Sequence, residues 1–258
     1  MEERRTILEM FGVSLEYLTE VVAANPSLRG ILAGYISERK LWDWFASDGR
    51  VTSIRKDDDH DRLQKGDLVV AYKGFDFRIE VKSLQTNSIE IFDRETGKWL
   101  KKVVQEPSVK QASGKRQRRK WIESEPFKVL WRKGPDDAVY RGGAQCDASD
   151  RRTIPVAGQQ VNTTNLLVGE FDILAASLFA FRERWDFGFI LNRNLPRSTY
   201  AKYPEEVRNQ LIKTMIPVTW PLPENFVSDP FTLLDQLVEE RNLSPPARQA
   251  TQKRPKKS

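Results

Sequence analysis

One cysteine, Cys146, and one histidine, His60, most restrict what this 258-residue chain can become. A lone cysteine cannot form an intramolecular disulfide, and it cannot build the thiolate cage of a structural zinc site. A lone histidine excludes zinc hydrolases with two or three imidazole ligands and helical HExxH proteases. The fold must therefore rest on an apolar core, and hydrolytic chemistry would have to use carboxylates, lysine and metals bound through oxygen.

The length is at the upper end for one domain and allows a sizeable core. An apolar fraction of 39% and a charged fraction of 30% are ordinary for a globular protein. No apolar run approaches the ~20 residues that cross a bilayer, and residues 1–5 carry acids instead of an apolar leader. We therefore expect a cytoplasmic protein with no membrane partner. The sequence has no P-loop motif, so we also expect no nucleotide cofactor.

The net charge of +6 is unevenly distributed. From Arg241 onward there are six cations and no acid, and residues 243–258 are expected to form a disordered basic tail. Residues 101–120 carry eight cations and one acid. The densest part of this stretch is predicted to contact DNA phosphates through Lys115, Arg116, Arg118, Arg119 and Lys120. The alternative is a disordered loop that only adds solubility.

The N-terminal region is predicted to be helical. Ser14 can cap a helix that runs to Ala24, and Asn25-Pro26 can cap and begin a second helix that ends near residue 45. Apolar residues with helical spacing predict the buried stripe of the second helix: Leu28, Ile31, Tyr35, Trp42 and Phe45. Glu38 falls inside this stripe, where a carboxylate needs a cationic partner.

Strand and loop patterns fill most of the remaining chain. Residues 66–71 and 77–83 predict a β-hairpin, and residues 171–179 predict a buried strand that pairs with residues 185–191. Two further helices are predicted over residues 203–215 and 231–242. Two polar stretches are predicted to be loops, at residues 96–125 and 141–160.

The hairpin carries the residues with the clearest chemistry. Asp67 stands at the start of its first strand, and the two-residue period of the second strand places Glu80 and Lys82 on one face. Asp67 can lie beside Glu80 across the antiparallel pair. Two carboxylates and an ammonium suit phosphodiester hydrolysis, because Mg²⁺ prefers oxygen ligands and lysine can orient water or stabilise phosphate charge. The alternative is a half-exposed cross-strand ion pair.

The sequence Gly66-Asp67 at a strand start, followed by Glu80-x-Lys82, resembles the PD-(D/E)xK nuclease superfamily, which includes most type II restriction endonucleases. Gly66 stands where the family's name has proline. The resemblance implies that Asp67 and Glu80 bind Mg²⁺, with Mn²⁺ able to substitute, and that Lys82 positions the attacking water. It also implies that Glu38 is an auxiliary catalytic acid and metal ligand.

The resemblance covers residues 25–85. It implies an α/β (α+β) fold with a restriction-endonuclease-like core, in which a mixed central sheet of about five strands is flanked by helices. We expect a single nuclease domain over residues 1–242. Its parts would be an N-terminal helical part (1–24), a catalytic core (25–100), DNA-contacting loops (101–165), and the remaining strands and closing helices (166–242).

Three other polar features have less specific interpretations. Arg151 and Arg152 can contact DNA bases, and can equally brace a loop through Arg–Asp pairs. The acidic run at residues 57–61 is predicted to be a solvated turn, because consecutive acids rarely converge on one ion. Asp172, in an apolar strand, is predicted to be a structural partner for an arginine or a group behind the site, and not catalytic.

The predicted function is sequence-specific cleavage of double-stranded DNA by a type II restriction endonuclease that acts as a homodimer. A repair or recombination nuclease with the same core is one alternative. A non-catalytic DNA-binding protein is another, because the two N-terminal helices loosely resemble a helix-turn-helix. The apolar stripe around Glu38 argues against a groove-reading role for the second helix, since it predicts a packed face.

Overall fold

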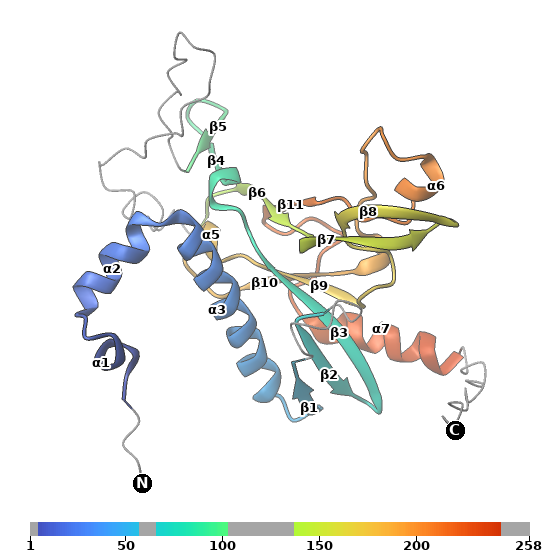
Figure 1. Cartoon of the computed structure of the whole chain (residues 1–258), viewed down its shortest axis with the longest axis horizontal. Helices are drawn as coiled ribbons and strands as arrows, with labels where there is room; N and C mark the ends of the chain where they lie inside the picture. Colours follow the sequence, from blue (N-terminus) through green and yellow to red (C-terminus); the bar gives the residue numbers. More distant parts are fainter. Residues whose placement is uncertain (1–4, 57–65, 103–136, 244–258) are drawn as a thin grey trace, which may run out of the picture.

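A five-stranded mixed sheet, in the order β1-β2-β3-β9-β10, lies at the centre of the molecule (Figure 1). The computed structural model describes residues 5–56, 66–102 and 137–243. β3 and β9 are parallel, and the other neighbouring strands are antiparallel. The predicted α/β (α+β) class with a central sheet of five strands is confirmed.

The central strands are β1 (Val51–Arg55), β2 (Leu68–Tyr72), β3 (Phe75–Ser83), β9 (Ile173–Ser177) and β10 (Phe187–Leu191). A four-stranded sheet contains β11 (Met215–Trp220), β6 (Tyr140–Gln145), β4 (Glu90–Asp93) and β5 (Lys98–Lys101). A two-stranded ribbon contains β7 (Asp147–Val156) and β8 (Gln159–Asn165). The helices are α1 (Ile7–Phe11), α2 (Leu15–Ala24), α3 (Pro26–Ala46), α5 (Phe179–Arg182), α6 (Glu205–Arg208) and α7 (Pro230–Leu243), with short 3₁₀ turns η1 (Thr86–Ser88) and η2 (Asn192–Asn194).

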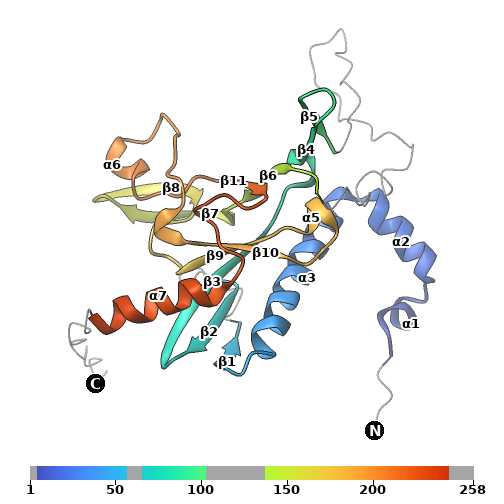
Figure 2. The same ribbon diagram turned by 180° about the vertical axis from the view of Figure 1, so that it is seen from behind.

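Two apolar clusters lie on opposite faces of the central sheet, because alternate residues of each strand point to opposite faces. On β9, Ile173 and Ala175 join the cluster that contains residues of α3 and α7. Leu174 and Ala176 join the cluster that contains residues of β6 and β11. Figure 2 shows α3 and α7 beside β1, β2 and β3. These helices therefore pack on one face, whereas the second sheet covers the other.

The N-terminal helices begin and end close to their predicted positions. The Ser14 side chain accepts a hydrogen bond from the Tyr17 amide (3.1 Å), so its predicted capping role is confirmed. Pro26 begins α3, but the Asn25 side chain makes no cap to this helix. It donates instead to the Val21 carbonyl (2.7 Å) and so completes the end of α2.

The buried face of α3 differs from the predicted stripe. Ser37, Leu41 and Phe45 are fully buried at intervals of four residues, whereas Ile31 and Tyr35 are each 57% exposed. The prediction for Ile31 and Tyr35 was wrong because helical spacing identifies an apolar row without saying which row meets the sheet. Packing against β3 selects the row through Ser37, whose Oγ lies 3.0 Å from Ser83 Oγ.

The predicted strand pairings are confirmed. β2 and β3 form the hairpin, with Leu68 opposite Ile79, and β9 pairs with β10. The predicted closing helix is α7.

Residues 141–160 form strands, and the loop prediction for them was wrong. Glycine was the misleading signal. A Cβ added to Gly142 would lie 2.7 Å from Ile89 Cδ1, so this glycine permits close packing inside a strand and does not mark a turn. β5 likewise occupies residues predicted as a loop.

The helix predicted over residues 203–215 shrinks to the single turn of α6. Leu211 and Ile212 instead make isolated bridges to Leu167 and Arg197. Tertiary pairing of the backbone therefore overrides the helical spacing of apolar residues in this segment. Among the described helices, none is long and apolar enough to cross a bilayer.

Candidate active site

Glu80 and Lys82 share one face of β3, as predicted. In the parallel pair with β9, Glu80 lies opposite Leu174 and Lys82 opposite Ala176. Both β9 residues belong to the apolar cluster under the second sheet. The two charged side chains therefore point away from α3, toward the layer that contains Cys146.

Three of the predicted catalytic residues lie together. Lys82 Nζ is 2.6 Å from Glu80 Oε1 and 3.9 Å from Asp67 Oδ2. Asp67 immediately precedes β2, and its Oδ2 accepts a hydrogen bond from the Val81 amide (2.7 Å). The hairpin thus holds Asp67 across from β3 through the backbone, while one ammonium lies between two carboxylates.

The side chains of Glu80 and Lys82 are largely removed from solvent. The Glu80 side chain is 6% exposed and that of Lys82 is 22% exposed. Burial alone would lower the pKa of Lys82, but the negative charges of Glu80 and Asp67 outweigh it and the net shift is upward. Lys82 therefore remains a cation at every ordinary pH.

The buried thiol of Cys146 lies in the same layer and is unreactive. Burial raises the pKa of Cys146 to about 12, and the negative charge of Glu80 adds to this shift. Cys146 is therefore a neutral thiol near pH 7, and neither a thiolate ligand nor a thiolate nucleophile is available from it.

The position before Asp67 requires glycine. Gly66 has a φ of +128°, and a Cβ there would lie 3.1 Å from Arg78 Cβ. Proline fixes φ near −65°, so it cannot adopt this conformation. The departure from the proline in the superfamily's name thus has a local cause in how the chain enters β2.

Glu38 is paired with a lysine. Its Oε2 lies 2.8 Å from Lys56 Nζ. α3 lies against the opposite face of β3 from Glu80 and Lys82. Among the described residues, no group of three acids, histidines or cysteines is arranged to hold a metal ion. The prediction of a cationic partner for Glu38 is met, whereas its role as an auxiliary acid and metal ligand stays a prediction.

Asp67 and Glu80 nevertheless have the chemistry that Mg²⁺ requires. Mg²⁺ commonly binds one or two carboxylates and completes its shell with water and substrate phosphate. The two carboxylates already converge on a cation, the Lys82 ammonium, which indicates that their negative charge is concentrated at one place. The residues present therefore fit a magnesium site.

Lys82 lines a groove with a volume of about 760 Å³. Glu38 lines the same groove from α3, which packs on the opposite face of β3 from Lys82. Its other walls come from α3, the segment after β3, and the segment around α5. A ligand can therefore reach Lys82 from solvent at the carboxyl end of β3.

Arg152 has a structural role that the sequence left undecided. Its two terminal nitrogens bind the two carboxylate oxygens of Glu170, one of them at 2.6 Å (Nη2 to Oε2). The side chains are 12% and 9% exposed. Arg152 is thus a buried brace, although its partner is Glu170 and not a nearby aspartate. Arg151 is exposed on β7.

Asp172 is a structural partner, as predicted. Its Oδ1 lies 2.7 Å from Arg241 Nη2, and its Oδ2 accepts a hydrogen bond from the Arg78 amide (2.7 Å). These contacts join α7 to β3 and to the start of β9.

Several predicted features lie outside the described residues. They are the acidic run with His60, the basic tail after residue 243, and the proposed phosphate contacts Lys115, Arg116, Arg118, Arg119 and Lys120.

No protein-family model matches the chain, and no curated protein matches it. Among solved structures, a bacterial homing endonuclease aligns with 83% of this chain and 95% of its own. The sequences are 14% identical, and the TM-score is 0.33. This similarity is too low to support an argument about the chain.

Replacing Gly66 with alanine is expected to destabilise the chain by roughly 1–2 kcal/mol, because the residue must hold a positive φ against Arg78. Gly49→Ala is the control, since an added Cβ at Gly49 meets nothing within 4 Å. Urea unfolding measures both variants. Equal midpoints for the two would contradict the conformational requirement.

Replacing Arg152 with alanine is expected to cost about 3–5 kcal/mol, because it leaves the Glu170 carboxylate buried without its partner. Arg151→Ala should leave the free energy of unfolding within about 0.5 kcal/mol of the wild type. Denaturant titration of the two variants is the measurement. A stable Arg152→Ala protein would show that the pair is not a brace.

Proposed function

We propose that this chain is a Mg²⁺-dependent nuclease that hydrolyses DNA phosphodiester bonds. The observation that carries the proposal is the convergence of Asp67 with Glu80 and Lys82 of β3, beside a groove that reaches Lys82. The sequence pattern of these three residues resembles that of the PD-(D/E)xK nucleases, and their three-dimensional proximity is what such chemistry needs.

Each residue has a distinct role in this proposal. Asp67 and Glu80 would hold Mg²⁺, and Mn²⁺ would substitute, because both ions accept carboxylate oxygens. The ion supplies charge neutralisation and polarisation at the phosphate. Lys82 stays charged beside the two acids, so its ammonium can orient a water molecule or stabilise negative charge on the phosphoryl oxygens.

A purely structural ion pair explains the site less well. Exposed cross-strand pairs contribute little to stability, and a buried pair is often no better than apolar side chains of similar size. Glu80 is 4% exposed, and its carboxyl oxygen lies 2.6 Å from the Lys82 ammonium. Retaining three charged groups there is easier to explain by chemistry than by stability.

A helix-turn-helix binder is disfavoured by the packing of α3. The row through Ser37, Leu41 and Phe45 is buried against the central sheet. A helix held this way is part of the core, and other residues of it line one wall of the groove beside Lys82. Metal-dependent cleavage separates an enzyme from a binder, and defined DNA substrates separate a restriction role from a repair role.

Within the nuclease class, we favour a type II restriction endonuclease that cuts double-stranded DNA as a homodimer. A symmetric site requires two active sites. Neither α1 nor α2 buries any residue. Large apolar side chains on α1, α2 and α3 are 38–65% exposed: Ile7, Met10, Phe11, Leu15, Tyr17, Ile31, Leu32, Tyr35 and Ile36. We propose that a second copy of the chain covers these exposed apolar side chains.

Changing Phe11 and Leu15 together to lysine should halve the molar mass measured by light scattering, because it places two charges among these apolar side chains. Leu243→Lys, at an 84% exposed position on α7, should leave the mass unchanged. A monomeric wild-type protein at tens of micromolar would rule out this interface.

Cleavage of plasmid and phage DNA in Mg²⁺ tests the activity, with Lys82→Ala compared with the wild type. We expect the rate to fall at least about 100-fold, the scale seen when a charge-stabilising group is removed from an active site. The exposed Lys98 provides the control variant, Lys98→Ala. EDTA should abolish cutting, and Mn²⁺ should restore it.

The product pattern then decides the class. Discrete fragments that disappear in Lys82→Ala would support a restriction role, whereas nicking or smearing would favour repair. If the folded wild-type protein cut no duplex, branched or single-stranded DNA, the nuclease proposal would fail.

A further inference from the structure

The groove beside Lys82 has an aromatic wall. Phe179, at the start of α5, and Trp185, just after it, are stacked with ring centroids 4.1 Å apart and an angle of 17° between the planes. Both rings line the groove and are only partly buried. Trp185 also lines an adjoining hollow of about 460 Å³, together with Trp44 and Trp220. The same groove thus contains a proposed catalytic lysine and a flat apolar surface.

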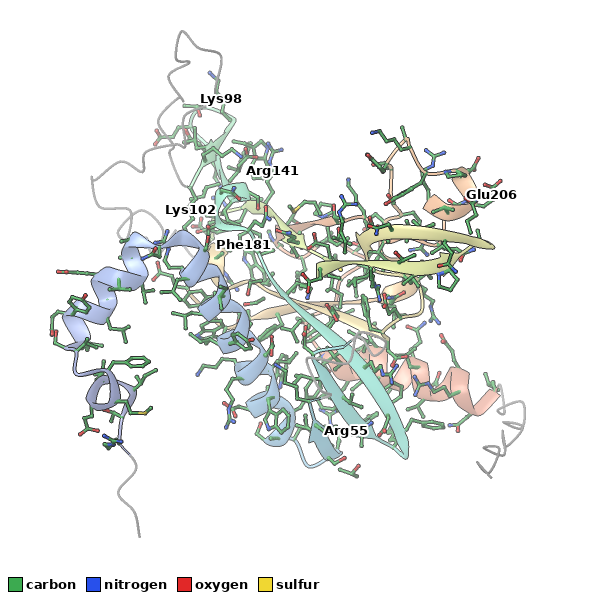
Figure 3. All side chains as sticks on the ribbon, viewed as in Figure 1. Arg55, Lys98, Lys102, Arg141, Phe181 and Glu206 are labelled. Carbon is green, nitrogen blue, oxygen red and sulfur yellow. The ribbon has the colours of Figure 1, made fainter. Side chains whose placement is uncertain are left out.

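The size of the groove limits what can enter it. Its volume of about 760 Å³ is that of a pocket for a small molecule. One or two nucleotides fit such a space, so a duplex can enter it only through nucleotides turned out of the double helix. Lys102 stabilises the helix α5, which carries Phe179. Its Nζ donates to the Ala180 and Phe181 carbonyls (2.8 and 3.0 Å), and Figure 3 shows Lys102 next to Phe181.

We propose that this groove binds unpaired nucleotides of the DNA strand to be cut, with a base stacked on the aromatic wall and the backbone leading to Lys82. Stacking on tryptophan suits any base, because every base has a π-face. The inference rests on the proposed function for the identity of the strand. The binding itself requires no cleavage and can be measured separately.

The wall formed by α3 leaves room for such a ligand. Gly30 and Gly34 both line the groove, and a Cβ added to either would meet nothing within 4 Å. Neither has a left-handed φ. Folding therefore requires glycine at neither position, although glycine inside a helix is less stable than alanine. Their bare backbone keeps open the space between α3 and the aromatic wall.

The polar lining matches a nucleotide as well. Gln85, Asn87 and Gln145 supply amide donors and acceptors, which can bind base edges. The lining contains two cations, Arg29 and Lys82, and one acid, Glu38. Lys82 is paired with Glu80, and Glu38 with Lys56. Arg29 donates to the Val22 and Ala23 carbonyls, so it is the lining cation whose charge can meet a phosphate.

Binding of a fluorescently labelled eight-residue oligothymidine to the full chain in EDTA tests the site. Trp185→Ala should weaken binding roughly 5- to 100-fold, the range expected from losing one stacked base, and Trp185→Phe should recover most of it. Trp99→Ala is the control, because this ring lies on β5 against Phe92 and outside the groove lining. Thermal unfolding confirms that each variant is folded.

A second variant adds bulk without removing a contact. Gly34→Leu places a side chain in the open space of the groove and should block the oligonucleotide while leaving the melting temperature unchanged or higher. Gly49→Leu, at an equally open position away from the groove, should bind as the wild type does.

Wild-type affinity in both Trp185→Ala and Gly34→Leu would overturn the proposal, as would no binding by the wild type. Equal competition by a blunt duplex of the same sequence would overturn its preference for unpaired nucleotides. Failure of the proposed function is seen separately, as no cleavage by the wild type in Mg²⁺ despite oligonucleotide binding that depends on Trp185.

Discussion

The Lys82 ammonium, set between the Asp67 and Glu80 carboxylates, is the interaction on which the site depends. Each of these charges would be costly to bury alone, and each is acceptable because the others are present. The backbone participates as well, since the Val81 amide holds Asp67 in place. Because β3 lies at the centre of the sheet, the cluster is held by strands on both sides and by the layers above and below.

The two faces of the sheet contribute differently to this arrangement. α3 and α7 bury one face in an aromatic and aliphatic core, whereas the second sheet encloses the face that carries Glu80 and Lys82. Arg241 and Asp172 tie the end of α7 to β3 and β9. The groove opens at the carboxyl end of β3, between Lys82 and residues of α3. A ligand can therefore enter beside the end of this central strand.

Glycine has three different uses in the chain. At Gly66 it permits a backbone conformation that positions Asp67, and at Gly142 it permits a strand to pack against Ile89. On α3, Gly30 and Gly34 meet neither requirement and border the groove. The same residue type therefore marks a strained entry to a strand, a close contact in the core, and a space left for a ligand. Sequence alone does not distinguish these uses, because each depends on neighbours distant in the chain.

Local periodicity was enough to determine the hairpin, the shared face of Glu80 and Lys82, the helices α2, α3 and α7, and the pairing of β9 with β10. These features depend on residues close in sequence or on a regular two- or four-residue repeat. Only the tertiary structure decided which row of α3 is buried, that Arg152 pairs with Glu170, that Glu38 pairs with Lys56, and that residues 141–160 form strands. Each of these outcomes depends on which distant segment packs alongside, and the energy of that packing exceeds the local preferences that the sequence displays.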